Sequence, residues 1–411
     1  MTPEIEKRIK AVQAGRVPAG YKKSKVGIVP KEWDVFSLKK ISTELHETAG
    51  NGRYETLSIS AGVGFVNQTS KFGKDISGAQ YAKYTVLKKG DFSYNKGNSK
   101  KYPQGCVYQL KDRDEAVVPN VFESFRLING ENDFFEQLFI NGFLNGQLFS
   151  KINHGVRDDG LLNLRGDDFY SCQVPFPPLS EQKKIAEILA TQDKVIELRE
   201  NLIAEKQSQK KYLMSVLLGD DFKKPFKLNG VTIDKKKWEK KKLGEIATLK
   251  TGSLPQSINN VGPYYYVNAG CENSGYTDSF NCEGNVITTP SRGQGGIGEV
   301  FYQEKPFWLG PLSYKIMVLK DISVKYVFYA MLFYKRKIKD EMKTGSIPAV
   351  NAGDLEKIKY NLPSLPEQKA IADVLSAADE EISLLQKGLE EEKLKKKSLM
   401  QLLLTGLVRA Q

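Results

Sequence analysis

The chain has 411 residues, of which 61 are Lys or Arg and 49 are Asp or Glu, so its formal net charge is +12. Its 40% hydrophobic and 27% charged residues are typical of a folded protein and exclude a chain that is disordered over long stretches. The excess of positive charge favours a polyanionic partner, and nucleic acid is favoured over a membrane.

The chain begins with the charged segment Met1–Gly15, which lacks the apolar centre of a signal peptide. The longest apolar run, Val327–Tyr334, is far shorter than a membrane span. The four cysteines do not have metal-ligand spacing, so reduced thiols are expected. We therefore expect a protein of a bacterial or archaeal cytoplasm that binds neither a metal nor a membrane.

After an N-terminal helical segment at residues 1–30, the first globular body reads as mixed α/β. β-rich runs are bounded by Gly, Asn and Lys turns, and one helix is predicted at Phe134–Ile152. The predicted strands of this body are Glu55–Ile59, Tyr84–Leu87, Asp91–Tyr94, Gly105–Leu110 and Ser124–Ile128.

A long helix follows the first body. Ser180–Leu218 contains no Pro or Gly, which predicts about 38 helical residues, or about 57 Å at 1.5 Å per residue. Pro178 and Glu181 mark the N-terminal turn, where a fixed φ and a negative charge are both favourable.

The second body and a second long helix repeat this order. The second body has one predicted helix, Val324–Met342, and the helix that follows contains one glycine, Gly388, which leaves its local straightness open. The predicted strands of this body are Tyr264–Val267, Asn285–Thr288, Gly298–Tyr302 and Ser313–Leu319.

The two halves are copies of one sequence pattern. Residues 177–218 align with residues 363–404 without a gap, and 18 of the 42 positions are identical. Trp33-x4-Leu38-x2-Ile41 recurs as Trp238-x4-Leu243-x2-Ile246, and Ser124–Leu127 is matched with Ser313–Ile316. Two copies are too few for a self-stacking solenoid, so they indicate a tandem of two similar bodies, each followed by a long helix.

The long helices carry apolar residues that mostly repeat every seven positions, which predicts a coiled-coil seam. Neither helix buries this stripe alone, so we expect them to pack on each other, antiparallel if the molecule has pseudo-twofold symmetry. Lys210 and Lys396 fall on the same seam and are expected to penalise other registers. The predicted seam residues are Leu189, Ile196, Ile203, Leu217, Leu375, Ile382, Leu385, Leu389, Leu399 and Leu403. The alternative is that each helix covers only its own body.

Loops that follow equivalent predicted strands are candidates for DNA contact. They combine cationic side chains, amide or hydroxyl donors and glycines, which suit phosphates and base edges. The alternative is an ordinary surface loop, where the same residue types are common. The candidates in these loops are Lys96, Asn98, Ser99, Lys100 and Lys101 in the first body, and Ser291, Arg292 and Gln294 in the second. A second pair of loops, which precedes the return to each long helix and gives a weaker signal, adds Arg157 and Ser346.

Signatures of catalysis are missing from the sequence. There is no GxxxxGK[ST] phosphate loop and no Asn- or Asp-Pro-Pro-aromatic tetrapeptide of an amino-methyltransferase. His46 and His154 lack a matching nucleophile or ligand set. We therefore expect no enzyme activity and no cofactor bound by this chain.

The repeated helix motif resembles that of the specificity subunit of type I restriction–modification systems. Pro363-x2-Pro366-Glu367-Gln368-x2-Ile371-Ala372 and its partner Pro177-Pro178-x2-Glu181-Gln182-x2-Ile185-Ala186 carry the resemblance, which covers nearly the whole chain. It implies target recognition domains at 31–175 and 221–361, separated by long helices at 176–220 and 362–411 that form an antiparallel coiled coil in a pseudo-twofold α/β (α+β) fold.

The resemblance also implies a function. Each domain would read one half of a split double-stranded DNA sequence, and the coiled coil would fix the spacer. Two modification subunits would bring S-adenosylmethionine, and two restriction subunits would bring ATP and Mg²⁺. Glu181, Gln182, Glu367 and Gln368, together with the N-terminal segment at residues 1–30, are candidates for partner docking. The alternatives are a self-contained methyltransferase or nuclease with unrecognised motifs, and a coiled-coil adaptor without a DNA role.

Overall fold

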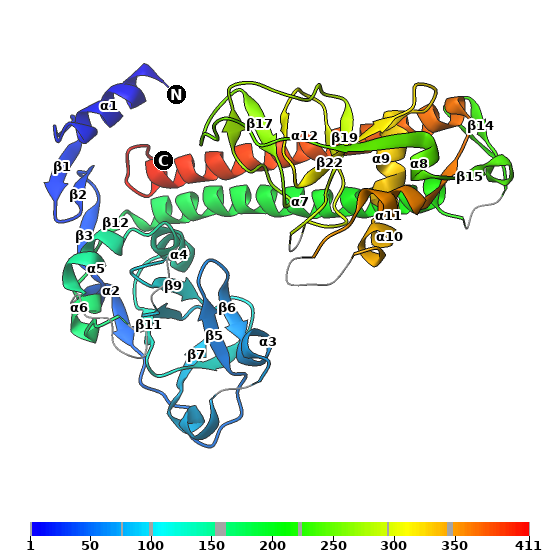
Figure 1. The fold of residues 1–411 in the computed structure, drawn as a ribbon. Helices are drawn as coiled ribbons and strands as arrows, with labels where there is room; N and C mark the ends of the chain where they lie inside the picture. The colour runs from blue at the N-terminus through cyan, green and yellow to red at the C-terminus, as the bar shows by residue number, and fades with distance from the viewer. Residues whose placement is uncertain are drawn as a thin grey trace. The chain divides into compact units, whose positions relative to one another are not determined.

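The computed structural model describes residues 2–74, 77–97, 102–152, 162–220, 224–293, 296–342 and 348–410. The chain divides into two compact units, which we call unit 1 (Met1–Leu198 with Leu389–Gln411) and unit 2 (Arg199–Gly388). The division falls within both long helices, α7 (Leu179–Leu218) and α12 (Leu365–Leu403), so each unit holds one body and about half of each helix (Figure 1).

Unit 1 begins with helix α1 (Pro3–Gln13) and a hairpin of β1 (Tyr21–Ser24) and β2 (Gly27–Pro30). Its central sheet has the order β4 (Ser42–Glu44), β11 (Glu123–Leu127), β8 (Phe92–Asn95), β9 (Cys106–Gln109). Three antiparallel pairs complete the strands: β3 (Asp34–Ser37) with β12 (Gln173–Phe176), β5 (Leu57–Ser60) with β6 (Gly64–Asn67), and β7 (Thr85–Lys88) with β10 (Glu115–Val118). The helices of the body are α2 (Leu38–Ile41), α3 (Gln68–Phe72), α4 (Asn132–Ile140), α5 (Asn145–Lys151) and α6 (Gly166–Tyr170).

Unit 2 repeats this plan, with a hairpin of β13 (Phe226–Leu228) and β14 (Val231–Ile233) ahead of the body. Its central sheet has the order β16 (Ala247–Thr251), β22 (Ser313–Val318), β19 (Val286–Pro290), β20 (Phe301–Gln303). A second sheet contains β18 (Tyr276–Thr277), β17 (Tyr264–Val267) and β21 (Trp308–Leu309), and β15 (Glu239–Lys242) pairs with β23 (Lys359–Leu362). Its body helices are α8 (Leu243–Ile246), α9 (Val324–Phe333), α10 (Lys335–Asp340) and α11 (Ala352–Lys357).

The structure confirms the predicted fold of two similar α/β bodies with long helices, and it corrects one match between them. Glu44 pairs with Phe125, and the residue 205 positions after Glu44, Leu249, pairs with Ile316. Phe125 is therefore equivalent to Ile316, and both are fully buried. The sequence match of Ser124–Leu127 with Ser313–Ile316 was two residues out of register, an even shift that keeps the same side chains on the core face.

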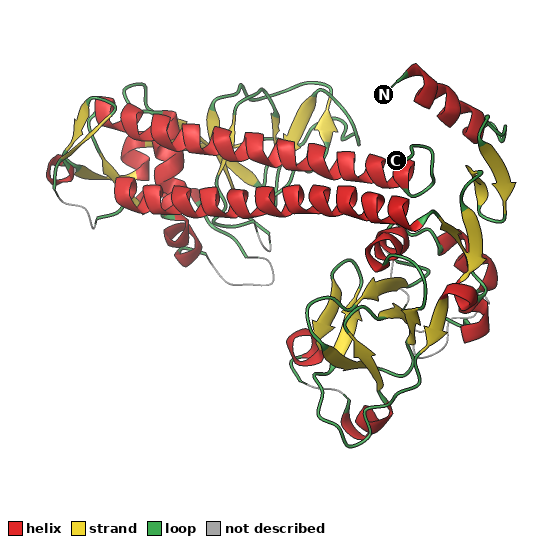
Figure 2. Cartoon of the chain, turned by 180° about the vertical axis from the view of Figure 1, so that it is seen from behind, coloured by secondary structure: helices red, strands yellow, loops and turns green. Residues whose placement is uncertain are grey.

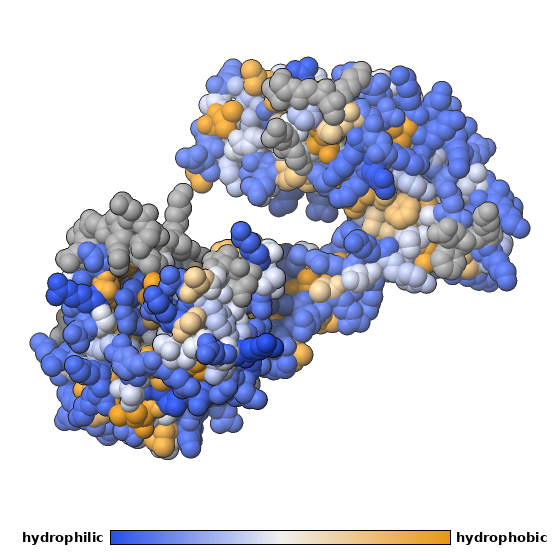
Figure 3. Space-filling view, turned by 90° about the horizontal axis from the view of Figure 1, so that it is seen from below, coloured by the Kyte–Doolittle hydropathy of each residue, from blue (hydrophilic) through white to orange (hydrophobic). Residues whose placement is uncertain are grey.

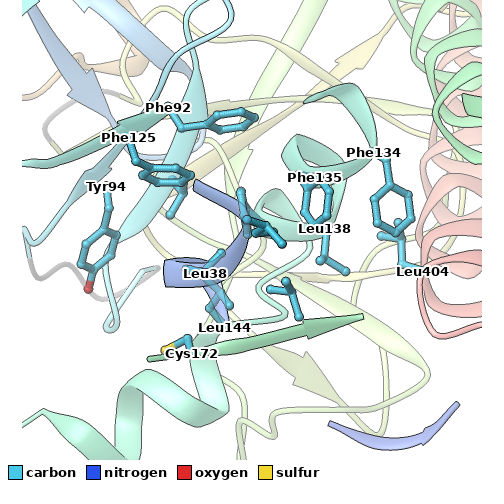
Figure 4. Packing of buried hydrophobic residues seen from close by; sticks show 14 of the residues in the cluster. Leu38, Phe92, Tyr94, Phe125, Phe134, Phe135, Leu138, Leu144, Cys172 and Leu404 are labelled. Atoms are coloured by element: carbon cyan, nitrogen blue, oxygen red, sulfur yellow. The ribbon is translucent and has the colours of Figure 1, made fainter. Parts of the chain in front are cut away.

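The body of unit 1 packs its own part of the two helices into one core. Phe92 and Phe125 stack with ring centroids 5.3 Å apart. On the other side of the cluster Phe134 of α4 lies beside Leu404, which directly follows α12 (Figure 4). Each such fully buried side chain contributes roughly 1.5–3 kcal/mol of transfer free energy. The core of unit 2 likewise joins Ile316 and Tyr326 of the body to Leu375 of α12.

The predicted helix Phe134–Ile152 is two helices, α4 and α5. The break follows Ile140, where Gly142 adopts φ +75°, a left-handed conformation that favours glycine. The predicted helix Val324–Met342 is likewise divided into α9 and α10 at Tyr334, which has φ −93° and ψ 22°. Apolar periodicity predicted both helical regions, but it did not locate the breaks because the apolar pattern continues across them.

The two long helices run antiparallel within each unit (Figure 2). In unit 1, Asp193 of α7 forms an ion pair with Lys396 of α12 at 2.5 Å. In unit 2, Lys210 of α7 forms the equivalent ion pair with Asp379 of α12. The two lysines expected to set the seam register thus each meet an aspartate of the other helix, and the two aspartates occupy matching positions of the repeat.

Of the ten predicted seam side chains, seven are buried and three are half-buried. Ile196, Leu385 and Leu399 are half-buried, while the other seven are at most 8% exposed. Leu189 and Leu403 also belong to the core of unit 1, and Leu217 and Leu375 to that of unit 2. The same stripe therefore packs against the bodies near the helix ends. The long helices thus pack on each other and also cover the bodies, which combines the two alternatives considered from the sequence.

Gly388 does not interrupt α12, which is continuous through it. An added Cβ would lie 2.9 Å from Nη1 of Arg199, the far end of a flexible side chain. Because glycine costs about 1 kcal/mol relative to alanine inside a helix, we expect Gly388→Ala to raise the free energy of unfolding by about 0.5 kcal/mol after Arg199 shifts. Urea denaturation measures this change, and a decrease would show that the position of Arg199 is fixed.

The face seen in Figure 3 is mostly hydrophilic, with apolar residues scattered over it. Such scattered apolar residues are normal on a folded protein. Among the helices that the structure describes, none is long and apolar enough to cross a membrane.

Candidate nucleic-acid interface

Strand β8 of unit 1 and strand β19 of unit 2 occupy the same interior position of their four-stranded sheets. The predicted DNA-contact loops begin directly after them, at Lys96 and Ser291. An interior strand is held by ladders on both sides, so each loop starts from a rigid base. The fold thus places the two loops equivalently in their bodies.

In unit 1 the described part of this loop is engaged within the body. The Lys96 ammonium lies 2.5 Å from the Glu123 carboxylate of β11, and both side chains are less than 20% exposed. Lys96 also accepts a backbone hydrogen bond from Leu162. A paired and shielded lysine is a weaker phosphate ligand than a free one, so Lys96 positions the loop. Asn98, Ser99, Lys100, Lys101 and Arg157 lie outside the described residues.

In unit 2 the fold brings together the loop that begins at Ser291 and the segment that includes Pro348 and Val350, which were separate candidates in the sequence. Val350 donates its backbone N–H to Ser291, and Gly293 donates to Pro348. Ser291 is 5% exposed and serves this junction, while the Arg292 side chain is exposed. Of the predicted contacts on the described residues, Arg292 remains the one cation available to DNA. Gln294 and Ser346 lie outside the described residues.

The Glu-Gln pair at the start of each long helix fixes the body to that helix. Gln182 accepts a hydrogen bond from the Glu131 N–H at 2.8 Å and donates to the Pro177 carbonyl at 2.7 Å. Gln368 accepts from the Ser323 N–H at 2.8 Å and donates to Pro363 at 2.8 Å. Both glutamines therefore join the start of a body helix, α4 or α9, to the start of a long helix.

The glutamates bind the tryptophans that open each body. Glu181 accepts a hydrogen bond from Trp33 Nε1 at 2.9 Å and two from Arg409, at 2.7 and 2.8 Å. The Glu181 hydrogen bonds raise the pKa of Arg409 above its ordinary value. This bidentate contact joins the segment after α12 to the start of α7.

Glu367 plays the same part in unit 2, where its partners among the described residues include no arginine. It accepts hydrogen bonds from Trp238 Nε1 at 3.2 Å, from the Asp234 N–H at 2.9 Å and from Ser364. Burial opposes ionisation of this carboxyl, but the hydrogen bonds outweigh it and lower its pKa.

These contacts argue against partner docking through Glu181, Gln182, Glu367 and Gln368. All four side chains are at most 7% exposed and are bonded to their own body. A side chain so buried offers a partner subunit little surface. The anchoring role alone explains why both halves of the repeat have this Glu-Gln pair, because each body needs the same anchor.

Replacing the anchoring carboxylate tests this account. We expect Glu181→Ala to lower the free energy of unfolding by about 3 kcal/mol, because it leaves Trp33 Nε1 without its acceptor and deprives Arg409 of its main partner. Glu367→Ala should cost about 1 kcal/mol less, since no arginine among the described residues bonds to Glu367. Urea unfolding measures both, with Glu187→Ala on the exposed side of α7 as the near-neutral control. Equal losses for all three variants would contradict the anchoring role.

A further pair of contacts ties each body to the ion pair between the helices. Gln137 of α4 donates to Asp193 at 3.0 Å, and Tyr329 of α9 donates to Asp379 at 2.8 Å. Each aspartate thus meets one lysine and one body side chain. Asp193 and Asp379 therefore each fix the position of a body relative to the pair of long helices.

The sequence did not single out Trp33, Asp193 or Arg409 as a contact network. For the tryptophans and aspartates a signal existed, since both recur at matching positions in the two halves. Arg409 had none, because its role depends on the fold bringing residues 228 positions apart together. Among the described residues, no group of three His, Cys, Asp or Glu side chains is arranged to hold a metal ion.

Comparison with known proteins identifies relatives over nearly the whole chain. The family described as "Type I restriction modification DNA specificity domain" matches residues 30–206 and 235–394. A Methanocaldococcus jannaschii protein, provisionally named a type I restriction enzyme MjaX specificity subunit, is 26% identical over 435 residues, covering 95% of this chain and 96% of its own. The type I restriction enzyme MjaVIII specificity subunit of the same organism is 27% identical over 274 residues, covering 59% of this chain and 63% of its own.

Solved structures share the fold. The S subunit of a type I restriction–modification system from M. genitalium superposes with a TM-score of 0.61 at 20% identity, covering 90% of this chain and 96% of that one. A chain from a structure on complex assembly and conformational transition of the type I R-M system gives a TM-score of 0.56 at 13% identity, covering 92% and 99%.

Proposed function

The chain belongs to the type I restriction–modification DNA specificity family, and on that premise we propose how its parts divide the work. It is a specificity subunit with two target recognition domains, a subunit that recognises DNA and does not itself catalyse a reaction. In our proposal each recognition domain reads one half-site of a bipartite double-stranded sequence. The paired helices set the number of unspecified base pairs between the half-sites.

The observation that carries this proposal is the repetition of one scaffold with different contents. Both bodies have the same sheet order and the same Glu-Gln anchor, yet the loops after β8 and β19 differ in almost every residue. A rigid and repeated frame with divergent loops suits two readers of two unlike half-sites. Phosphate contacts would position each body, and side chains of its loops would read base edges.

We further propose that two modification subunits and two restriction subunits assemble on this chain. They would carry S-adenosylmethionine, ATP and Mg²⁺, and the complex would act in the cytoplasm of a bacterium or archaeon. The exposed sides of the two helix starts, where Lys183 and Lys369 recur, remain available for docking while the anchor residues face inward. Matching surfaces on the two helices would receive two copies of the same partner.

Mapping methylated adenines across the host genome, with and without this gene, tests the proposal. The expected result is one bipartite motif with a fixed gap that disappears when the gene is removed. The purified full chain should also bind a duplex with that motif more tightly than a scrambled duplex at the same salt concentration. An ungapped motif, or methylation by the chain without partners, would contradict the proposal.

A further inference from the structure

A long stretch of unit 2 carries no positive charge. Between Thr251 and Ser291 there is neither Lys nor Arg, although the chain has 61 of them. The stretch has six asparagines and four tyrosines instead. The start of the body in unit 1 differs, since it includes Arg53, Lys71 and Lys74. A DNA-reading body that excludes cations from one segment has little phosphate-binding chemistry there.

The fold gathers this neutral chemistry around a cavity of about 420 Å³. Strands β17, β18 and β20 and the segment between β17 and β18 line it. Its lining includes the amides of Asn268, Asn273 and Gln303 and the rings of Tyr265, Tyr276 and Phe301. No Lys or Arg is among the residues described as lining it, and one carboxylate, Glu272, is.

Two of the amides are held in place by the framework, and the third is not. Asn268 Oδ1 accepts the Leu312 N–H at 2.9 Å, and Gln303 Nε2 donates to Thr288 at 3.0 Å. Asn273 is exposed, and its side chain has no hydrogen bond among the described residues. The lining of the cavity thus has two amides oriented by the framework and one exposed amide, that of Asn273.

We propose that this cavity receives the major-groove edge of an A·T base pair, with Asn273 as a specificity-determining contact. The inference rests on the proposed function and names the chemistry by which unit 2 reads its half-site. A side-chain amide matches the adenine N6 donor and N7 acceptor in a bidentate contact, whereas guanine is most often bound by Arg or Lys. Glu272, the one carboxylate of the lining, disfavours contact with the N7 and O6 acceptors of guanine.

We assign a phosphate contact of unit 2 to a hollow beside the cavity. Tyr265, Phe301 and Gln303 line both the cavity and a second hollow of about 610 Å³. The charged residues of that hollow are Lys210, Lys305 and Lys325 together with Glu304, Asp379 and Glu380, and Lys210 is paired with Asp379. Lys305 is exposed and forms no ion pair with another described residue. Lys305 is therefore the cation of this hollow that we assign to phosphate. Both Asn273 and Lys305 can be replaced without removing a described hydrogen bond.

The test compares Asn273→Ala with Lys305→Ala in the full chain assembled with its modification subunits. Asn260→Ala, an exposed asparagine outside the cavity, is the matched control. We expect Asn273→Ala to reduce discrimination at one A·T position of one half-site by roughly 5- to 150-fold. The slope of log K against log salt should stay unchanged. Lys305→Ala should weaken binding to all sequences and reduce that slope by about 0.9.

Unaltered base preferences in Asn273→Ala, relaxation at a G·C position, or a changed salt slope would each overturn the inference. Failure of the proposed function gives a different result, because the unmodified complex would then show no bipartite sequence preference at all. Titration of duplexes with every single-base change, at three salt concentrations, provides both readouts.

Discussion

Exchanging residues 36–174 for the equivalent segment of another specificity subunit is expected to replace one half-site of the recognised sequence and leave the other unchanged. The two bodies lie in separate compact units, and their cores contain different side chains. The exchange keeps Trp33 and Glu181, so the anchor of unit 1 remains available to the new body. Sequencing of methylated adenines in cells that carry the hybrid reads the outcome directly.

The reciprocal exchange of residues 241–360 is the matched control, and it should change the other half-site alone. The donor segments need a backbone N–H where Glu131 or Ser323 donates to the anchoring glutamine. A hybrid with two altered half-sites would contradict the proposal that each body recognises one half-site on its own. A hybrid that fails to fold is recognised by circular dichroism before any motif is interpreted.

Adding one heptad to each long helix is expected to lengthen the spacer by about three base pairs. Seven residues after Leu198 and seven after Gly388 extend each helix by about 10 Å, which equals the rise of about three base pairs. Three base pairs also rotate the duplex by roughly 100°, whereas a heptad rotates a helix by only about 20°. We therefore expect a longer preferred spacer together with weaker binding, measured on duplexes that differ only in spacer length.

A heptad added to α7 alone is the control for that experiment. The ion pairs Asp193–Lys396 and Lys210–Asp379 lie on opposite sides of the insertion point, so a single insertion cannot preserve both. This variant should lose stability without acquiring a longer spacer. An unchanged spacer in the double insertion would show that the helices do not set the distance.

The sequence predicted the long helices and the repeated bodies because both leave strong local signals. α7 lacks helix-breaking residues over its whole length, and its motif recurs in α12. The strand order of the central sheets was not predictable in the same way, since pairing such as that of β11 with both β4 and β8 is non-local. The hairpin β1–β2 was also missed, because its four-residue strands have too short an apolar pattern.

The candidate interface was predictable only in part. Residue type indicated the loops after β8 and β19, but not that Lys96 is paired with Glu123 or that Ser291 is buried. Burial depends on which distant segment covers a loop, as Val350 covers Ser291. The cavity of unit 2 was missed because only the folded sheet brings Gln303 of β20 to Asn268 and Asn273, which share the segment between β17 and β18.

Each long helix carries both the acid and the base of the interhelical bridge: Asp193 and Lys210 on one, Asp379 and Lys396 on the other. Either helix is therefore chemically self-complementary. A half-length relative with one body and one such helix would have both partners of the ion pair. It could therefore form a homodimer about a true twofold axis. That homodimer would recognise a palindromic DNA sequence. Fusion of two diverged copies in one polypeptide would allow the two half-sites to differ.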